Sequence, residues 1–348
     1  MTEIIEQEII NTNRTELEDL FSRANKIAEE SEDYIIPKAN LTNVRMNEYG
    51  GLSFLCESGA KSLFMSDHAL NQLSTKVGVP TRYVTKCVRS GRIELAQDNI
   101  NSWLEEYNKS LMIREHNNKV RGILSSKYSV CDTHEILDVL GNTLDLDNYT
   151  IKGHFLSPER FHLRLVCKEQ LPIPNEDLYS GIVIDSSDVG RSILTCKYLI
   201  YKKVCTNGLI VTRGVNDLFS QRHINIYKDE FARGLEVSMK AIPQLDEIIC
   251  KRIESTRQED LSSVLKYGED LRDIYNLSDE ELADVLDEIK TSAKISEDKA
   301  KEVISVYTSG RYDMTRWGYI NSLTDVAKTL TLENRIELEK YASTLLIA

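Results

Sequence analysis

One stretch of the chain decides the fold: Arg191-Ser-Ile-Leu-Thr-Cys-Lys-Tyr-Leu-Ile-Tyr-Lys-Lys-Val-Cys-Thr-Asn-Gly-Leu-Ile-Val-Thr-Arg213. It is rich in β-branched and aromatic residues, which are enriched in strands, and it contains no acid. Asn207-Gly208 lies between two apolar runs. A two-residue primed turn needs positive φ at both central positions, which this pair supplies, so a hairpin is predicted here.

Alternating and helical patterns extend this hairpin into a larger fold. Strands are predicted over about 109–115, 119–124, 149–156, 161–166 and 181–184, and helices over about 65–77, 81–92, 93–108 and 133–144. Further helices are predicted over about 229–256, 259–273, 278–288, 296–307 and 322–346. We therefore expect an α+β fold, in which a central, mainly antiparallel sheet with interleaved helices precedes an all-helical C-terminal part.

Charge is unevenly distributed along the 348 residues, whose net charge is −12. Residues 1–60, an acidic N-terminal helix and short hairpin, hold 5 basic and 12 acidic residues. Residues 61–228 form the mildly basic α+β core, and residues 229–348 the acidic helical part. The short helix over 81–92 carries Arg82, Lys86, Arg89 and Arg92 at helical spacing. The acidic segments on either side of the core have two explanations. Their helices carry acidic, solvated faces, or the two segments frame a basic working surface on the core.

The cysteines and the apolar runs bear on the compartment. The seven cysteines include no CxxC pair, which favours free thiols in a reducing compartment. No segment has the features of a signal peptide, and no apolar run is long enough to span a bilayer. We expect a cytoplasmic protein that does not bind a membrane.

Catalytic and metal-binding patterns are weak. Cys205 is a candidate nucleophile only if His162 or His223 meets it in space, and packing on a strand is the preferred interpretation. His154 and His162, across a predicted hairpin, make at most half a metal site. The loop with Asp185 and Asp188 could hold Mg²⁺, but Asx turns explain it better. No phosphate-binding or dinucleotide motif is present, so no cofactor is expected.

Five segments together resemble a known family. They are Val79-Pro80-Thr81-Arg82-Tyr83, Val120 to Tyr128, Gly181 to Gly190, Val204-Cys205-Thr206-Asn207-Gly208-Leu209-Ile210 and Trp317 to Thr324. In order and spacing this set resembles the phage- and plasmid-borne proteins grouped as domain of unknown function 932, over roughly residues 60–345. Asp185 stands where that pattern has Asn. The resemblance implies a mobile-element gene in a bacterial host cell, and DNA replication, recombination or counter-defence as its setting.

Cations interleaved with tyrosines on strands favour a nucleic-acid interface, since cations bind phosphates and aromatic rings stack on bases. The residues assigned to it are Arg121, Lys127, Arg164, Arg191, Lys197, Tyr201, Lys202, Lys203 and Arg213. The first hypothesis is a homo-oligomeric protein that binds or anneals single-stranded DNA. The second is a non-enzymatic protein that contacts a host defence or replication factor through its acidic helices, and the third is a Cys205 hydrolase or transferase.

Overall fold

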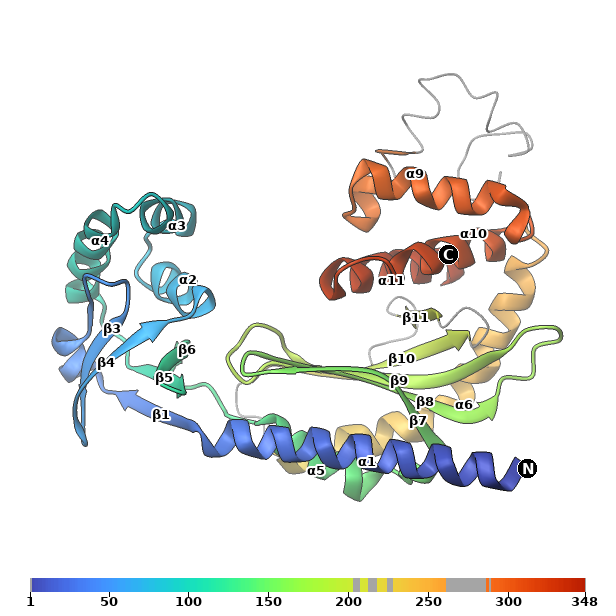
Figure 1. Cartoon of the computed structure of the whole chain (residues 1–348), viewed down its shortest axis with the longest axis horizontal. Helices are drawn as coiled ribbons and strands as arrows, with labels where there is room; N and C mark the ends of the chain where they lie inside the picture. Colours follow the sequence, from blue (N-terminus) through green and yellow to red (C-terminus); the bar gives the residue numbers. More distant parts are fainter. Residues whose placement is uncertain are drawn as a thin grey trace.

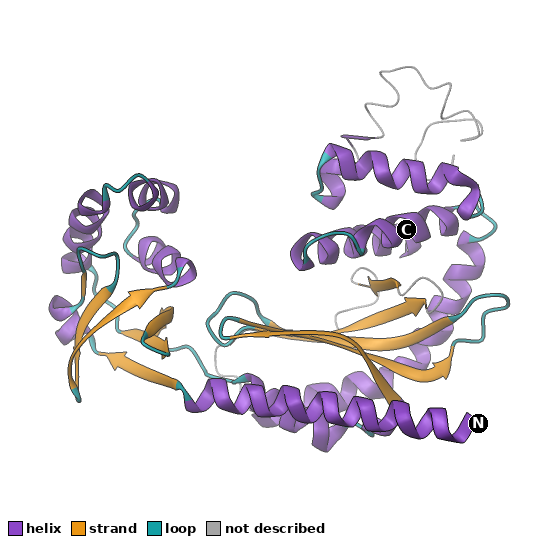
Figure 2. Ribbon diagram, in the orientation of Figure 1, coloured by secondary structure: helices purple, strands orange, loops and turns teal. Residues whose placement is uncertain are grey.

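Two sheets, each covered by its own helices, make up the fold of the computed structural model (Figures 1 and 2). The structure describes residues 2–202, 207–211, 218–223, 228–260, 286–287 and 289–347. The expected α+β class, with mainly antiparallel strands and a helical C-terminal region, is confirmed. No helix in these ranges is both long and apolar enough to cross a bilayer.

The first sheet belongs to the N-terminal third of the chain. Its strand order is β1 (Ser31–Ile36), β5 (Leu111–His116), β6 (Lys119–Ser125), β4 (Gly59–Met65), β3 (Leu52–Cys56) and β2 (Arg45–Met46). Only β4 and β6 pair in parallel, because the chain crosses between them through three helices. Asn117 and Asn118, at φ 50° and 60°, form the turn between β5 and β6, the two strands that the sequence predicts over 109–115 and 119–124.

Three helices pack on this sheet: α2 (Asp67–Lys76), α3 (Thr81–Arg89) and α4 (Ile93–Glu106), and a 3-10 turn, η1 (Lys38–Asn43), precedes β2. The Ser66 hydroxyl accepts a hydrogen bond from the Ala69 N–H at 3.1 Å and caps α2. Leu73, Val84 and Ile100, one from each helix, are buried in the core under the sheet. The apolar sides of the three helices therefore face inward, and their polar sides face solvent.

The second sheet has the order β11 (Asn207–Val211), β10 (Leu194–Lys202), β9 (Leu178–Ser186), β8 (Arg160–Gln170) and β7 (Tyr149–Ser157), with β12 (Phe219–Gln221) also on β10. All its pairs are antiparallel. The predicted pairing of β10 with β11 is present, but Asn207 and Gly208 lie opposite Lys202 and Tyr201 within the ladder. The prediction that they form a two-residue turn was wrong.

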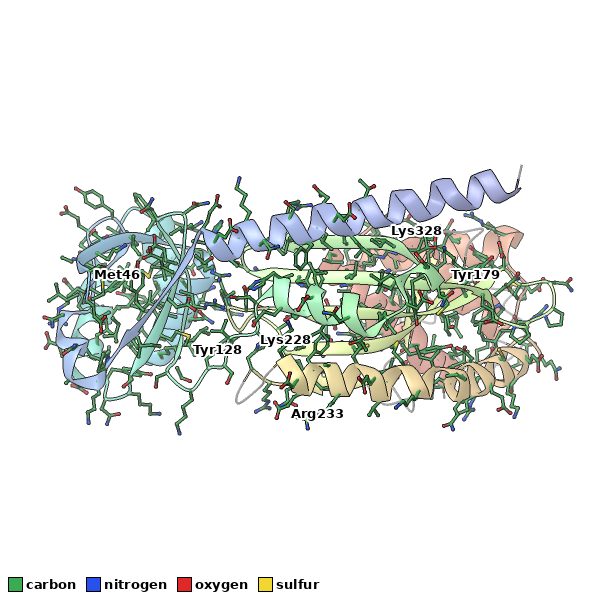
Figure 3. All side chains as sticks on the ribbon, turned by 90° about the horizontal axis from the view of Figure 1, so that it is seen from below. Met46, Tyr128, Tyr179, Lys228, Arg233 and Lys328 are labelled. Carbon is green, nitrogen blue, oxygen red and sulfur yellow. The ribbon has the colours of Figure 1, made fainter. Side chains whose placement is uncertain are left out.

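Helices cover both faces of the second sheet. On one face lie α1 (Thr2–Glu29), α5 (Thr133–Thr143) and α6 (Lys228–Thr256), side by side in Figure 3, and η2 (Leu146–Asn148) follows α5. On the other face lie α10 (Arg316–Ala327) and α11 (Leu332–Ile347), with α9 (Glu297–Val306) and the π turn η4 (Tyr307–Arg311) outside them (Figure 1). Asp132 caps α5 in a capping box with Glu135.

The helical C-terminal region shares its core with the second sheet, since Leu323 of α10 and Leu338 of α11 belong to the same buried cluster as Leu163 and Ile182. Two of the predicted helices, over 229–256 and 296–307, correspond to α6 and α9. The predicted helix over 322–346 is two helices, α10 and α11. Those over 259–273 and 278–288 fall mostly outside the described residues.

The expected segment boundaries relate to these elements in different ways. A boundary at 60/61 falls inside β4, which pairs with β3 on one side and β6 on the other. Residues on both sides of it therefore build one sheet, and the acidic N-terminal segment does not fold apart from the core. The boundary at 228/229 coincides with the start of α6, which packs on the sheet that precedes it.

Candidate functional site

Two of the four arginines assigned to a nucleic-acid surface, Arg121 and Arg164, are buried in ion pairs. Arg121 of β6 donates from Nη1 to Asp188 Oδ2 at 2.9 Å and to the Pro158 carbonyl at 2.7 Å. Arg164 of β8 forms a bidentate pair with Glu339 of α11, at 3.0 and 2.8 Å. Both arginines are at most 3% exposed, so neither guanidinium reaches a phosphate outside the protein.

The assigned residues Tyr201 and Lys202 of β10 contact the helices α11 and α10, which cover one face of the second sheet. Tyr201 is buried against Val183 and Ile336 of α11, and Lys197 is half-buried. The Lys202 ammonium pairs with Glu176 at 2.8 Å and donates to the Asn321 amide oxygen at 3.2 Å. Tyr198, on the opposite face of β10 from Tyr201, is buried and donates to Asp246 of α6.

The remaining assigned residues are dispersed. Lys127 is exposed, and Arg191 is exposed but pairs with Glu159 at 3.1 Å. Lys203, Arg213 and Cys205 lie outside the described residues. In the described part of the chain, the assigned residues therefore do not come together on one open surface. Sequence patterns did not reveal the helices that cover this sheet face or the acids that neutralise its cations.

The residues considered for metal binding belong to other networks. His154 lies opposite Leu163 and approaches Glu16 of α1, whereas His162 is on the other sheet face, so the two do not meet. His162 Nδ1 lies 2.9 Å from Asp185 Oδ1, and Arg164 Nε donates to His162 Nε2. Among the described residues no group of three or more His, Cys, Asp or Glu could hold a metal ion.

The pKa of Asp185 follows from this network. Burial disfavours its charged form, but the His162 hydrogen bond and the positive charges of Lys197 and Arg160 outweigh burial and hold its pKa below the usual value. Arg164 Nε donates to His162 Nε2, and the other ring nitrogen, Nδ1, faces Asp185. The loop acid that could have held Mg²⁺ is thus part of a buried structural network.

A second polar network joins the two sheets. Arg114 of β5, 1% exposed, contacts Asp33, Asp132 and the Asp188 carbonyl. Burial, the largest influence, raises the pKa of Asp132, Arg114 lowers it, and the neighbouring Asp188 raises it; the net pKa is above the usual value. These side chains lock the loop after β9 to the first sheet.

Tyr128 and His223 complete this junction, and Figure 3 shows Tyr128 between the two parts of the molecule. The Tyr128 hydroxyl donates to the Ser187 carbonyl at 2.8 Å, and its ring stacks on His223 at 5.2 Å between centroids. Neither ring nitrogen of His223 has a hydrogen-bond partner among the described residues. Two of the motif segments, 120–128 and 181–190, therefore meet at a structural joint.

Exposed and unpaired cations lie instead on α3. Arg82, Lys86 and Arg89 are exposed and line a depression of about 500 Å³ with Thr81, Thr85 and Ser90. Val84 and Cys87, on the opposite side of the helix, are buried. Arg92 is exposed just after the helix, and none of the four cations forms an ion pair with a described residue. We refer to Arg82, Lys86, Arg89 and Arg92 as the α3 basic face.

Helices α3 and α4 also carry exposed aromatic rings and acids. Tyr83 is 37% exposed, and its hydroxyl accepts a hydrogen bond from Asn99 of α4. Trp103, one helical turn beyond Asn99, is 50% exposed. The exposed acids of α4, such as Asp98, limit the positive region to α3 and its C-terminal end.

The sequence carries a signal for the α3 basic face, although its pattern of cations and tyrosines favours an interface on the strands. The four cations recur at helical spacing, and no acid occurs between His68 and Ile93. What the sequence could not show is which cations stay unpaired, because that depends on acids distant in the chain. Glu339 neutralises Arg164 across 175 residues, for example.

Comparisons of the chain with family models, with curated proteins and with solved structures found no match.

Proposed function

We propose that the protein binds nucleic acid and that the α3 basic face is its phosphate-binding surface. The single observation that carries the proposal is a set of exposed cations without a described acidic partner, three on one side of a short helix and a fourth, Arg92, just after it. Unpaired cations attract phosphates because binding releases the counterions condensed on the polymer. The mobile-element setting that the resemblance implies is compatible with this function.

A single strand is the form of nucleic acid that we propose. Single-strand binders combine a basic track with aromatic rings on which bases stack. Tyr83 on α3 and Trp103 on α4, the helix that contacts α3, offer exposed rings. The acids of α4 repel a phosphate backbone, so the strand follows α3. Annealing in recombination or replication, and assembly as a homo-oligomer, are further parts of the proposal.

The test uses fluorescence anisotropy of a labelled single strand at low salt. The variant Arg82→Glu, Lys86→Glu, Arg89→Glu should lose at least a hundredfold in affinity. A matched control, Arg233→Glu, Lys240→Glu, Arg252→Glu, removes three exposed cations of α6 and adds the same negative charge, and it should bind far better. Equal losses in the two variants, or no binding by the wild-type chain, would remove the proposal.

A contact with a host protein is the second candidate function. The observation that favours it is a groove of about 1090 Å³ between α1, α5 and β8, whose floor includes Leu140 and Leu165. Its lining has six carboxylates, Glu18, Glu29, Glu30, Asp138, Asp145 and Asp147, and two lysines, Lys26 and Lys168. This charge suits a basic segment of a partner protein.

The two candidates are separated by point variants and not by deletion of residues 234–348, because that deletion would remove buried core residues of α10 and α11. Asp145→Lys with Asp147→Lys changes the groove and leaves α3 intact. If the nucleic-acid proposal is correct, the groove variant retains its affinity for single-stranded nucleic acid. If the function depends on the groove, that function is lost in the groove variant and kept in the α3 variant.

A further inference from the structure

A pocket of about 570 Å³ lies at the end of β10, between the loop before β9 and the start of α10. Its volume is in the range of small-ligand sites. Lys202, Glu176, Trp317 and Asn321 form its centre. Two of these, Trp317 and Asn321, come from the motif segment 317–324, which neither the junction nor the α3 basic face uses.

The central lysine is held in a fixed position. Lys202 Nζ contacts Glu176 Oε2 at 2.8 Å and Asn321 Oδ1 at 3.2 Å. It also lies 5.9 Å from the Trp317 ring centroid and 6.0 Å from that of Tyr312. An ammonium has three N–H groups, and described residues accept hydrogen bonds from two of them. No described residue accepts from the third N–H, which can donate to a ligand acceptor.

The groups around Lys202 are themselves fixed. Trp317 Nε1 donates to Glu176 Oε1 at 2.8 Å, and Asn321 Nδ2 donates to the Trp317 carbonyl at 2.7 Å. Gly318 lies so close to the Asp313 carbonyl oxygen that a Cβ there would be 1.8 Å from it, so only glycine permits this start of α10. The pocket is preorganised, which reduces the entropy cost of binding a ligand.

The charge of the lining decides which ligand class fits. Glu176 neutralises Lys202, and Asp325 pairs with Arg311 at 2.6 Å. The lining also includes Asp177 and Asp313, neither of which pairs with a described cation. The pocket is thus net negative and disfavours a phosphate or carboxylate inside it.

Its aromatic and amide groups favour a flat, neutral, polar ring. Tyr312 is half-buried at the wall, and Gln170 and Asn175 line the pocket beside it. The amide oxygen of Gln170 has no partner in the described part of the chain, because its only bond there is the donation from Nε2 to the Glu176 carbonyl. Aromatic walls stack on planar rings, and amides pair with the donors and acceptors at their edges.

We propose that this pocket binds one nucleobase, with Lys202 donating to a carbonyl or ring nitrogen at the base edge and the sugar and any phosphate outside. The base could belong to a free nucleoside or to an unpaired position of a strand. This proposal does not depend on the α3 basic face, which lies in the part of the molecule built on the other sheet (Figure 1).

The test uses the two tryptophans of the chain, Trp103 and Trp317. In Trp103→Phe, all tryptophan emission comes from Trp317, beside the proposed base. Titration with adenosine, guanosine, cytidine and thymidine should change this emission saturably for at least one of them, while ribose 5-phosphate and inorganic phosphate should not. The reciprocal Trp317→Phe protein, which reports only Trp103, should give no saturable change with the affinity seen in the Trp103→Phe protein.

Variants assign the effect to the pocket. In the Trp103→Phe background, Lys202→Met should weaken binding at least tenfold. The matched control is Lys152→Met, which removes another lysine lying 5.9 Å from a tyrosine ring centroid, outside the pocket, and it should retain binding. If Lys202→Met fails to fold, Tyr312→Leu at the pocket wall replaces it, with the same expected tenfold loss.

Competition identifies the source of the base. If an oligonucleotide competes with the nucleoside and the same oligonucleotide with abasic sites does not, the pocket binds unpaired bases of a strand. If neither oligonucleotide competes, the pocket binds free nucleosides. No saturable change with any nucleoside at millimolar concentration, or equal affinity in the Lys152→Met and the Lys202→Met or Tyr312→Leu proteins, overturns the proposal. The α3 variant should retain nucleoside binding, so failure of either proposal is seen separately.

Discussion

Single residues with long-range partners decide how the strand cations act. Arg164 and Glu339 are both at most 4% exposed and are bonded at two points, so each charge is stable in the core only with the other present. Arg335 also donates to Glu339 at 2.8 Å. The pair links α11 to the second sheet. Arg164, which the sequence assigned to a binding surface, therefore has a structural role.

Removal of one partner should therefore be costly. Glu339→Gln leaves the Arg164 charge buried and is expected to lower the free energy of unfolding by about 3–5 kcal/mol, as for other broken buried pairs. The exposed pair Lys251 and Glu247 is the control, and Glu247→Gln should cost far less than Glu339→Gln, because solvent screens an exposed pair. Urea denaturation measures both, and similar small losses would show that the buried pair does not stabilise the fold.

His223 is the residue whose charge state is most sensitive to pH at the junction. Burial, followed by the nearby Arg114 charge, lowers its pKa from 6.5 to about 4. Between these values the unfolded chain binds the proton and the folded chain does not, so stability falls as the pH drops from about 6.5 to 4. A shift of this size corresponds to at most about 3 kcal/mol.

His223→Phe should keep the stacking on Tyr128 and remove the titrating group. Since neither ring nitrogen has a partner among the described residues, the replacement should cost little at pH 7. Thermal unfolding from pH 7 to pH 4.5 should show a smaller loss of stability in the variant than in the wild-type chain. A pH profile parallel to that of the wild type would disprove this role.

At the scale of elements, α11 covers apolar residues of the second sheet. Ile336 packs against Val183 and Tyr201, and Leu338 and Ala342 are fully buried. The sequence predicted a helix in this region from its apolar spacing, but it could not say whether the helix meets its own sheet or a second subunit. Helical periodicity gives a buried side and does not identify what covers it.

Truncation after Thr331 tests the role of α11. The shortened chain should lose cooperative unfolding and bind a hydrophobic dye, because Val166, Val183 and Leu199 would become exposed. Circular dichroism and dye fluorescence measure this. A sharp thermal transition without dye binding would mean that the sheet is stable without the helix.

At the scale of the whole molecule, the sequence predicts the element types well and their assembly poorly. Alternation predicted most of the strands, including those over 109–115 and 119–124, which correspond to β5 and β6. The division into two sheets was not predicted, because β4 and β6 pair across three helices and no local pattern records that contact. The candidate site was hard to predict for the same reason. Spacing in the sequence shows the α3 cations, but only the tertiary structure shows that they are unpaired among the described residues while acids neutralise the strand cations.

Phosphate binding by the α3 basic face is tested most directly by the dependence of strand affinity on salt concentration. Each phosphate contact on a single strand contributes about 0.7 to the negative slope of log affinity against log salt. The neutralised variant Arg82→Gln, Lys86→Gln, Arg89→Gln should therefore bind with a slope about 2 units shallower than the wild-type chain. The corresponding Gln variant of Arg233, Lys240 and Arg252 should retain the wild-type slope. Equal slopes in the wild-type and α3 proteins would contradict the assignment of phosphate binding to the α3 basic face.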